Sequence, residues 1–213
     1  MKQLRVLVAC EESQTICKAF RALGHEAYSC DLQDCSGGHP EWHIKGDALT
    51  LLNKDWDLII AHPPCTYMSK AGARWMYPKA GQLSEERYEL AMQAKDFFMQ
   101  FYNAKCEHIA IENPVPLKVV NLPKETQTKY GEPYSKATRL WLKGLPTLKP
   151  TNILADYVPW MPSNTGGFSR GEGGSHGIAH DAKTASKTFE GVAKAIAEQW
   201  SEYLLNCTET YSI

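Results

Sequence analysis

The sequence predicts an α/β fold, a doubly wound and mostly parallel sheet, in a chain of 213 residues. Short apolar segments alternate with segments of helical periodicity through the first half, which is the rhythm of βαβ units. Polar residues follow several apolar segments directly, as expected at the carboxyl ends of parallel strands, where such sheets bind ligands. Because no internal repeat or long linker divides the sequence, we expect a single domain over residues 1–213.

The expected strands follow from short, nearly continuous apolar runs. They cover residues 4–10, 25–30, 56–61 and 108–111. A further strand pair is expected within 130–148, around residues 139–142.

Three helices follow from apolar spacing. They cover residues 13–23, 84–102 and 189–205. In the first, Ile16, Phe20 and Leu23 share one face, and Gly24 is a natural C-cap. In the second, Ser84 can cap the amino end, where Glu85 and Glu86 favour the positive end of the helix dipole. In the third, Val192, Ile196 and Trp200 form a stripe that we interpret as core packing. The glycine-rich segment 161–180 predicts a mobile loop.

Composition limits the possible partners. The net charge is −1, whereas proteins that grip duplex DNA across many phosphates usually carry a basic excess, so any nucleic-acid contact should be local. No apolar run approaches the roughly 20 residues of a membrane span, and the first residues lack a signal-peptide layout, so we expect a cytoplasmic protein without membrane partners. Seven irregularly spaced cysteines indicate free thiols in a reducing compartment. Cys35, His39 and His43 could form part of a zinc site, but a polar loop is the more frequent explanation.

Four polar clusters coincide with predicted strand ends. They are Cys10-Glu11-Glu12-Ser13, Asp31, His62-Pro63-Pro64-Cys65 and Glu112-Asn113-Pro114. Asp31 stands where an acidic residue usually binds a ribose diol, although aspartate is also a common turn former. The first cluster contains no glycine, and its two carboxylates would repel a pyrophosphate. This argues against NAD and ATP and favours a cationic ligand such as S-adenosylmethionine.

The Pro-Pro-Cys sequence is the most specific feature of the chain. Two prolines stiffen the backbone directly after a buried strand and hold the Cys65 thiol in a fixed direction over the ligand crevice. The alternative is a buried structural cysteine. Proline-rich loops are rarely core, and Glu112 ends another predicted strand, so a catalytic pair is the better interpretation.

These motifs resemble those of DNA cytosine-C5 methyltransferases. His62-Pro63-Pro64-Cys65 is similar to their Pro-Cys motif, and Ile111-Glu112-Asn113-Pro114 is similar to their Glu-Asn motif. The layout is most similar to that of small methyltransferase-like proteins of phages and prophages, which share strings such as 61–67 and 140–146. The resemblance implies a Rossmann-like class I methyltransferase fold with S-adenosylmethionine as cofactor, and a bacterial host cell as the place where the protein acts.

The resemblance also implies roles for individual residues. Cys65 would be the nucleophile and Glu112 its acid/base partner. Asp31 would contact the cofactor ribose and Asp47 the adenine. The remaining cofactor contacts would come from Cys10, Glu11, Glu12, Ser13, His62 and Pro63, and the substrate contacts from Pro64, Tyr67, Asn113 and Arg139.

The chain departs from the larger enzymes of that family in ways that affect target choice. The first loop lacks their glycines, and no separate target-recognition domain is present. We therefore expect DNA or a cytosine nucleotide as substrate, with short specificity or a protein partner for target selection. Local contacts could come from Lys70, Arg74, Lys79, Lys136, Arg139 and Arg170, with Tyr67 and Trp75 as stacking rings.

Two alternatives belong to other classes. Methyltransferases of exocyclic amino groups (cytosine N4 or adenine N6) use an Asp-Pro-Pro-aromatic loop, of which residues 62–65 could be a variant with Tyr67 as the ring. A methyltransferase-like shell without catalysis, which binds a nucleotide or a protein partner, is the other.

Overall fold

The computed structural model describes residues 2–131, 134–151, 158–159 and 187–209. The predicted loop at 161–180 and Arg170 lie outside these residues, as does the side chain of Lys136.

Within these residues, eight strands form one sheet, in the order β3-β2-β1-β4-β5-β7-β6, with β8 paired to β7. Their bounds are β1 Arg5–Ala9, β2 Glu26–Asp31, β3 His43–Lys45, β4 Leu58–Ala61, β5 Ile109–Pro114, β6 Gln127–Gly131, β7 Tyr134–Lys143 and β8 Val158–Pro159. Strands β1 to β5 pair in parallel, whereas β7 runs antiparallel to both β5 and β6. The predicted strand pair around residues 139–142 is therefore confirmed.

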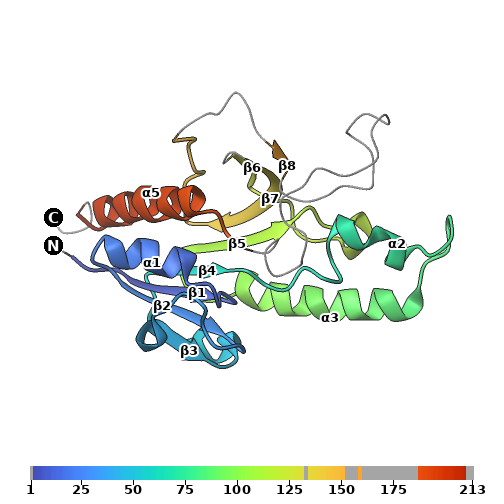
Figure 1. Ribbon diagram of the computed structural model, residues 1–213, viewed down its shortest axis with the longest axis horizontal. Helices are drawn as coiled ribbons and strands as arrows, with labels where there is room; N and C mark the ends of the chain where they lie inside the picture. The colour runs from blue at the N-terminus through green and yellow to red at the C-terminus, as the bar shows by residue number, and fades with distance from the viewer. Residues whose placement is uncertain (1, 132–133, 152–157, 160–186, 210–213) are drawn as a thin grey trace.

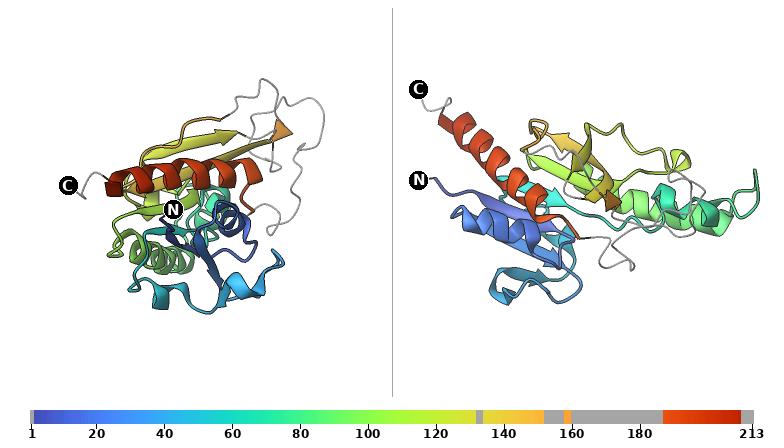
Figure 2. Two further views of the ribbon diagram at one scale, coloured as in Figure 1. Left: turned by 90° about the vertical axis from the view of Figure 1, so that its left-hand side faces the viewer. Right: turned by 45° about the horizontal axis from the view of Figure 1, so that its top comes forward.

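Helices cover both faces of the sheet (Figures 1 and 2). The α-helices are α1 Thr15–Ala22, α2 Ala73–Met76, α3 Glu85–Tyr102 and α5 Glu190–Glu209, and short 3-10 helices are η1 Pro40–Trp42, η2 Ala48–Leu51, η3 Lys70–Gly72 and η4 Lys118–Val120. Figure 1 shows α1 and α5 on one face and α3 on the other. This confirms the predicted α/β fold with a doubly wound, mostly parallel sheet.

Alternation along the strands divides the apolar residues between two cores. Ile59 and Ile111 face α3, whereas Ile60 and Ala110 face α1 and α5. The second core also contains Ile196 and Trp200 from α5, as predicted for the apolar stripe of that helix.

Two helix ends agree with the prediction and one residue does not. The Ser84 hydroxyl accepts a hydrogen bond from the Arg87 amide at 3.3 Å, as an N-cap does. Gly24 follows α1 with a φ of +84°, which favours glycine. The prediction for Leu23 was wrong. Because α1 ends at Ala22, Leu23 leaves the apolar face and is 45% exposed.

The sheet changes winding direction between β1 and β4. From β1 the chain continues to β2 and β3 on one side, and β4 and β5 lie on the other side. Ligand crevices in open α/β sheets form at the carboxyl ends of the strands at such a switch point. None of the helices in the described part of the chain combines the length and apolar character that crossing a membrane requires.

Candidate active site

The carboxyl ends of β4 and β5 bring two predicted site residues into contact. The strands pair in parallel with Ala61 opposite Ile111, so the next residues, His62 and Glu112, are also neighbours. His62 Nδ1 lies 3.1 Å from Glu112 Oε2, and the two side chains are only 12% and 18% exposed. A histidine and a carboxyl group at this distance can share a proton across a hydrogen bond.

The turn that contains Cys65 is held by backbone hydrogen bonds. The Cys65 carbonyl accepts from the amides of Met68 and Ser69, at 3.1 and 2.9 Å. The next residues are tied to the segment after β5, because the Lys70 amide donates to the Val115 carbonyl at 2.8 Å. Within this turn the Cys65 side chain is half-buried.

Asn113 fastens the proline loop to β5. Its side-chain amide donates to the Pro63 carbonyl at 2.7 Å, and the residue is only 1% exposed. Pro63 is buried and Pro64 exposed. The asparagine predicted to touch substrate therefore also joins the loop before Cys65 to the strand that ends in Glu112.

A small cavity of about 30 Å³ adjoins the His62–Glu112 pair. Its other lining residues come from β7, from the segment before α5 and from α5 itself: Thr138, Leu140, Lys187, Thr188, Phe189, Val192 and Ile196. His62 Nε2 is buried and has no hydrogen-bond partner among the described residues. The pair therefore lies against a largely apolar wall, where an electrostatic interaction is stronger than in water.

The loop after β1 turns through two left-handed residues. Cys10 and Gln14 have φ values of +60° and +59°, a conformation in which glycine is the common residue. Between them, the Glu11 carboxylate accepts from the amides of Ile16 and Cys17, at 2.7 and 3.2 Å, at the amino end of α1. Through these two hydrogen bonds the carboxylate caps the helix, and Glu11 is only 5% exposed. Its predicted cofactor contact stays a prediction.

A second loop braces the first. The Gln14 side chain donates to the His39 carbonyl at 2.7 Å and accepts from the His39 amide at 3.1 Å. The Ser36 amide donates to the Glu12 carbonyl at 2.8 Å. Between these bonds Gly37 lies so close that a Cβ there would be 2.5 Å from Gln14 Cβ. The loop after β2 thus packs tightly against the loop after β1.

Acidic residues gather at the ends of β1, β2 and β3. Burial raises the pKa of the Cys10 thiol to about 12, with further contributions from Asp31, Cys30 and Asp47. The two carboxylates are thus near enough to Cys10 to act on it electrostatically. One oxygen of each also accepts a local amide: Asp31 from Gln33 and Asp47 from Leu49, both at 2.9 Å. Asp31 is therefore a turn former, as the alternative interpretation has it, and its ribose contact stays a prediction.

Ser13 lies at the exit of the first loop. Its hydroxyl is 3.0 Å from that of Thr15, the first residue of α1. It remains half-buried at the carboxyl end of β1.

Two predicted substrate contacts are engaged with other side chains. The Arg87 guanidinium lies over the Tyr67 ring, 4.3 Å from its centre, and also donates to the Thr66 carbonyl at 2.7 Å. Arg139 lies on β7, opposite Asn113 of β5, and forms an ion pair of 3.2 Å with Glu125. One face of Tyr67 is therefore covered.

The segment after Cys65 exposes cations and one large ring. Lys70, Arg74 and Lys79 are exposed. Trp75 is 58% exposed, and the Arg74 guanidinium lies 4.7 Å from its ring centre. These residues form the basic and aromatic surface that lies next to the cysteine turn in the sequence.

The histidines once considered for zinc have other partners. The His39 ring stacks on Trp42 with centres 3.7 Å apart, and its Nδ1 lies 3.0 Å from Glu41. His43 Nδ1 lies 2.8 Å from the Ser29 hydroxyl. Within the described ranges, no three His, Cys, Asp or Glu side chains are placed to hold a metal ion.

Sequence reasoning missed the bracing residues. Nothing in the sequence marks Arg87 as the residue that covers Tyr67, because the two are brought together only by the packing of α3. Gln14 is equally unremarkable until its backbone conformation is known.

Comparison with known proteins gives little further guidance. No protein-family model and no curated protein matches the chain. Among solved structures, a prophage-encoded E. coli protein, described provisionally as a DNA modification methyltransferase, is similar with a TM-score of 0.43 and 17% identity. The alignment covers 74% of this chain and 53% of that one, so this chain spans about half the length of that protein. A similarity at this level does not assign a function.

Proposed function

We propose that this chain is an S-adenosylmethionine-dependent methyltransferase that acts on carbon 5 of cytosine in DNA or in a cytosine nucleotide. The observation that supports it most is the parallel pairing of β4 and β5, with Ala61 opposite Ile111. This pairing makes His62 a neighbour of Glu112, and the Asn113 side chain is hydrogen-bonded to Pro63, which supports a proposed nucleophile and acid on two adjacent strands. A reaction that needs both groups at once benefits from such a rigid support.

Cys65 has the nucleophilic role. Carbon 5 of cytosine is a poor nucleophile until a thiolate adds to carbon 6 and converts the ring to an enamine. The fixed turn at Cys65 directs the thiol for this addition. After carbon 5 has accepted the methyl group, it loses its proton to a base, and elimination of the Cys65 thiol restores the ring.

Glu112 stabilises the ring during the addition. Negative charge develops at ring nitrogen N3 as the thiolate adds, and a proton delivered there neutralises it. His62 and Glu112 can hold that proton between Nδ1 and Oε2, which are 3.1 Å apart. His62 thus orients the carboxyl group and shares its proton, a role that we add to the cofactor contact predicted from the sequence.

The two carboxylates near Cys10, those of Asp31 and Asp47, suit the proposed cofactor. Asp31 and Asp47 present carboxylates at the ends of β2 and β3, and such groups bind a ribose diol and an amino group. Negative charge there also suits a ligand that carries a sulfonium and an ammonium group. When bound, S-adenosylmethionine supplies an electrophilic methyl group.

Nucleic-acid contacts would be local, as the net charge of −1 requires. The exposed side chains of Lys70, Arg74 and Lys79 can meet phosphates, and Trp75 can stack on a base. The amino-group alternative depends on Tyr67 as a stacking ring. The guanidinium over one face of that ring makes this alternative less favourable.

Nucleoside mass spectrometry of DNA from expressing cells tests the proposal. We expect 5-methylcytosine with the wild-type chain, none with Cys65→Ala, and a loss of roughly two orders of magnitude or more in transfer rate with Glu112→Gln. Cys35→Ala, which changes another half-buried thiol, is the matched control and should retain activity. A 5-fluorocytosine substrate should trap a covalent adduct on Cys65.

The other classes predict different outcomes. Full transfer by Cys65→Ala, with methyl groups on N4 or N6, would establish the amino-group alternative. Absence of cofactor binding in calorimetry, together with absence of any methylated base, would establish a non-catalytic shell.

A further inference from the structure

A basic cleft lies on the outer side of α1, on the part of the sheet that carries β2 and β3. It has a volume of about 530 Å³. Its lining residues are Gln3, Lys18, Arg21, Ala22, Gly24, His25, His39 and Trp42, and none of them is acidic. In a chain of net charge −1, such a local excess of basic side chains calls for an anionic ligand.

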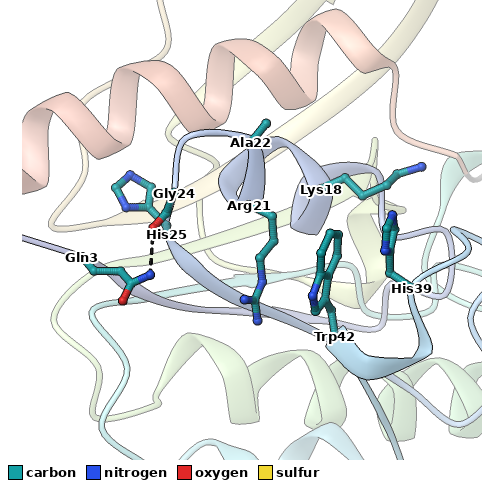
Figure 3. A pocket seen from close by; sticks show the side chains of 8 residues that line it. All are labelled: Gln3, Lys18, Arg21, Ala22, Gly24, His25, His39 and Trp42. Carbon is teal, nitrogen blue, oxygen red and sulfur yellow. Dashed lines mark hydrogen bonds between the residues drawn. The ribbon is translucent and has the colours of Figure 1, made fainter.

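The cleft has a rigid wall of rings. His39 and Trp42 are stacked with an interplanar angle of 10°. The Arg21 guanidinium lies 5.2 Å from the Trp42 ring centre and 4.9 Å from that of Tyr28, and its Nε donates to the Ala27 carbonyl at 2.7 Å. Arg21 is therefore held in one orientation, with its charge beside the cleft. Figure 3 shows Lys18 and Arg21 extending from α1 toward the loop that carries His39 and Trp42.

Lys18 and Arg21 differ in the contacts that they already make. Lys18 is exposed, and its ammonium group has no ion pair within the described part of the chain. Glu11 is the carboxylate on which Lys18 acts electrostatically, but it is buried, bonded to the Ile16 and Cys17 amides, and does not line the cleft. Glu41 does not line the cleft either, and it is paired with His39 at 3.0 Å. Lys18 is thus an exposed cation available to a ligand, whereas Arg21 is held in place by its contacts.

We propose that this cleft binds a phosphate group of a nucleic-acid strand, held between Lys18 and Arg21 beside the His39–Trp42 stack. The phosphate chemistry follows from the cleft itself, and only the identity of its carrier rests on the proposed function. An enzyme that takes a base out of a stack must offset a few kcal/mol, and phosphate contacts away from the reacting base supply part of that. A free nucleotide offers the same phosphate chemistry, so the experiment has an arm for each.

Fluorescence anisotropy with a labelled single strand and with the matching duplex tests the first arm. Lys18→Glu should weaken binding at least tenfold. It should also reduce the slope of log binding constant against log salt concentration by about 1, the value for one lost phosphate contact. Lys54→Glu introduces the same charge change at an exposed lysine before β4 and should change the affinity less than twofold. Equal effects of the two variants, or no binding by the wild-type chain to any phosphate ligand, would overturn the proposal.

Titration followed by amide NMR tests the second arm and locates the ligand. With the oligonucleotide, the amides of Gly24, His25 and Trp42 should shift in the wild-type chain and not in Lys18→Glu. If instead only a nucleoside monophosphate or inorganic phosphate produces these Lys18-dependent shifts, the strand is the wrong carrier. Because neither measurement needs cofactor or turnover, Lys18-dependent strand binding by a chain that methylates nothing would retain the cleft and reject the proposed function.

Discussion

Replacing Glu11 by alanine tests whether this carboxylate primarily holds α1 in place. Its oxygens accept from the Ile16 and Cys17 amides at 2.7 and 3.2 Å, in surroundings where the residue is 5% exposed. An amide left without an acceptor in a buried position costs about 1–3 kcal/mol, and loss of an N-cap costs about 1 kcal/mol in most proteins. Removing a buried carboxylate returns part of its desolvation cost.

We therefore expect Glu11→Ala to lower the free energy of unfolding by about 2 kcal/mol, since burial offsets part of the hydrogen bonding. For a chain of this size that corresponds to a fall in Tm of about 4–8 °C, measurable by circular dichroism. Glu85→Ala is the control, because Glu85 also lies in the first turn of a helix but is exposed. A fall in Tm no larger than that of Glu85→Ala would refute the capping role.

The pH dependence tests a separate consequence of the burial of Glu11. Burial raises the pKa of Glu11 above its ordinary value of 4.5, although the His62 charge and the two amides oppose this. A group with a raised folded-state pKa contributes stability at low pH and loses it as the pH rises through that pKa. The stability of the wild-type chain relative to Glu11→Gln should therefore decline as the pH is raised from 4.5 toward neutrality. An unchanged difference over this range would show that Glu11 has an ordinary pKa.

Three further outcomes are expected. Gly37→Ala should lower the free energy of unfolding by about 1–3 kcal/mol in urea, because its Cβ would lie 2.5 Å from Ser13 O, whereas Gly46→Ala, with open space at the Cβ, should not. Cys10 should resist alkylation by iodoacetamide at pH 8 in a mass-spectrometric assay until the chain is unfolded, since its pKa is raised to about 12. Asp31→Ala should weaken S-adenosylmethionine binding at least tenfold, about 1.4 kcal/mol, in calorimetry, and an unchanged affinity would remove Asp31 from the cofactor site.

Periodicity predicted the fold well because the sheet is buried on both faces. The strands read as continuous apolar runs, and the helices that cover them repeat their apolar residues at helical spacing. The clusters at residues 62–65 and 112–114 were also visible, since polar residues mark the carboxyl end of a buried strand. Residues 62–65 follow β4, whereas residues 112–114 are the last residues of β5, which continues beyond the end predicted at residue 111. The prediction that Leu23 lies on the buried face of the helix was wrong, because helix ends depend on local capping. An apolar residue one position beyond the helix end no longer faces the core.

The direction of individual side chains could not be predicted from the sequence. Glu11 reads as an acid of the ligand crevice, yet its carboxylate turns back to α1. The left-handed backbone of Cys10 and Gln14 makes this turn possible. A left-handed conformation is uncommon for residues other than glycine, so the sequence does not predict it at these positions. Similarly, Lys18 and Arg21 are three residues apart and share a helix face, but the rings opposite them come from residues 39–42, beyond β2.

The two candidate sites share one structural element. His39 lines the basic cleft, and its backbone exchanges two hydrogen bonds with the side chain of Gln14, the last residue of the loop after β1. That loop begins at Cys10, beside the proposed cofactor carboxylates. These two hydrogen bonds therefore join the residues of the basic cleft to the loop that begins beside the proposed cofactor carboxylates.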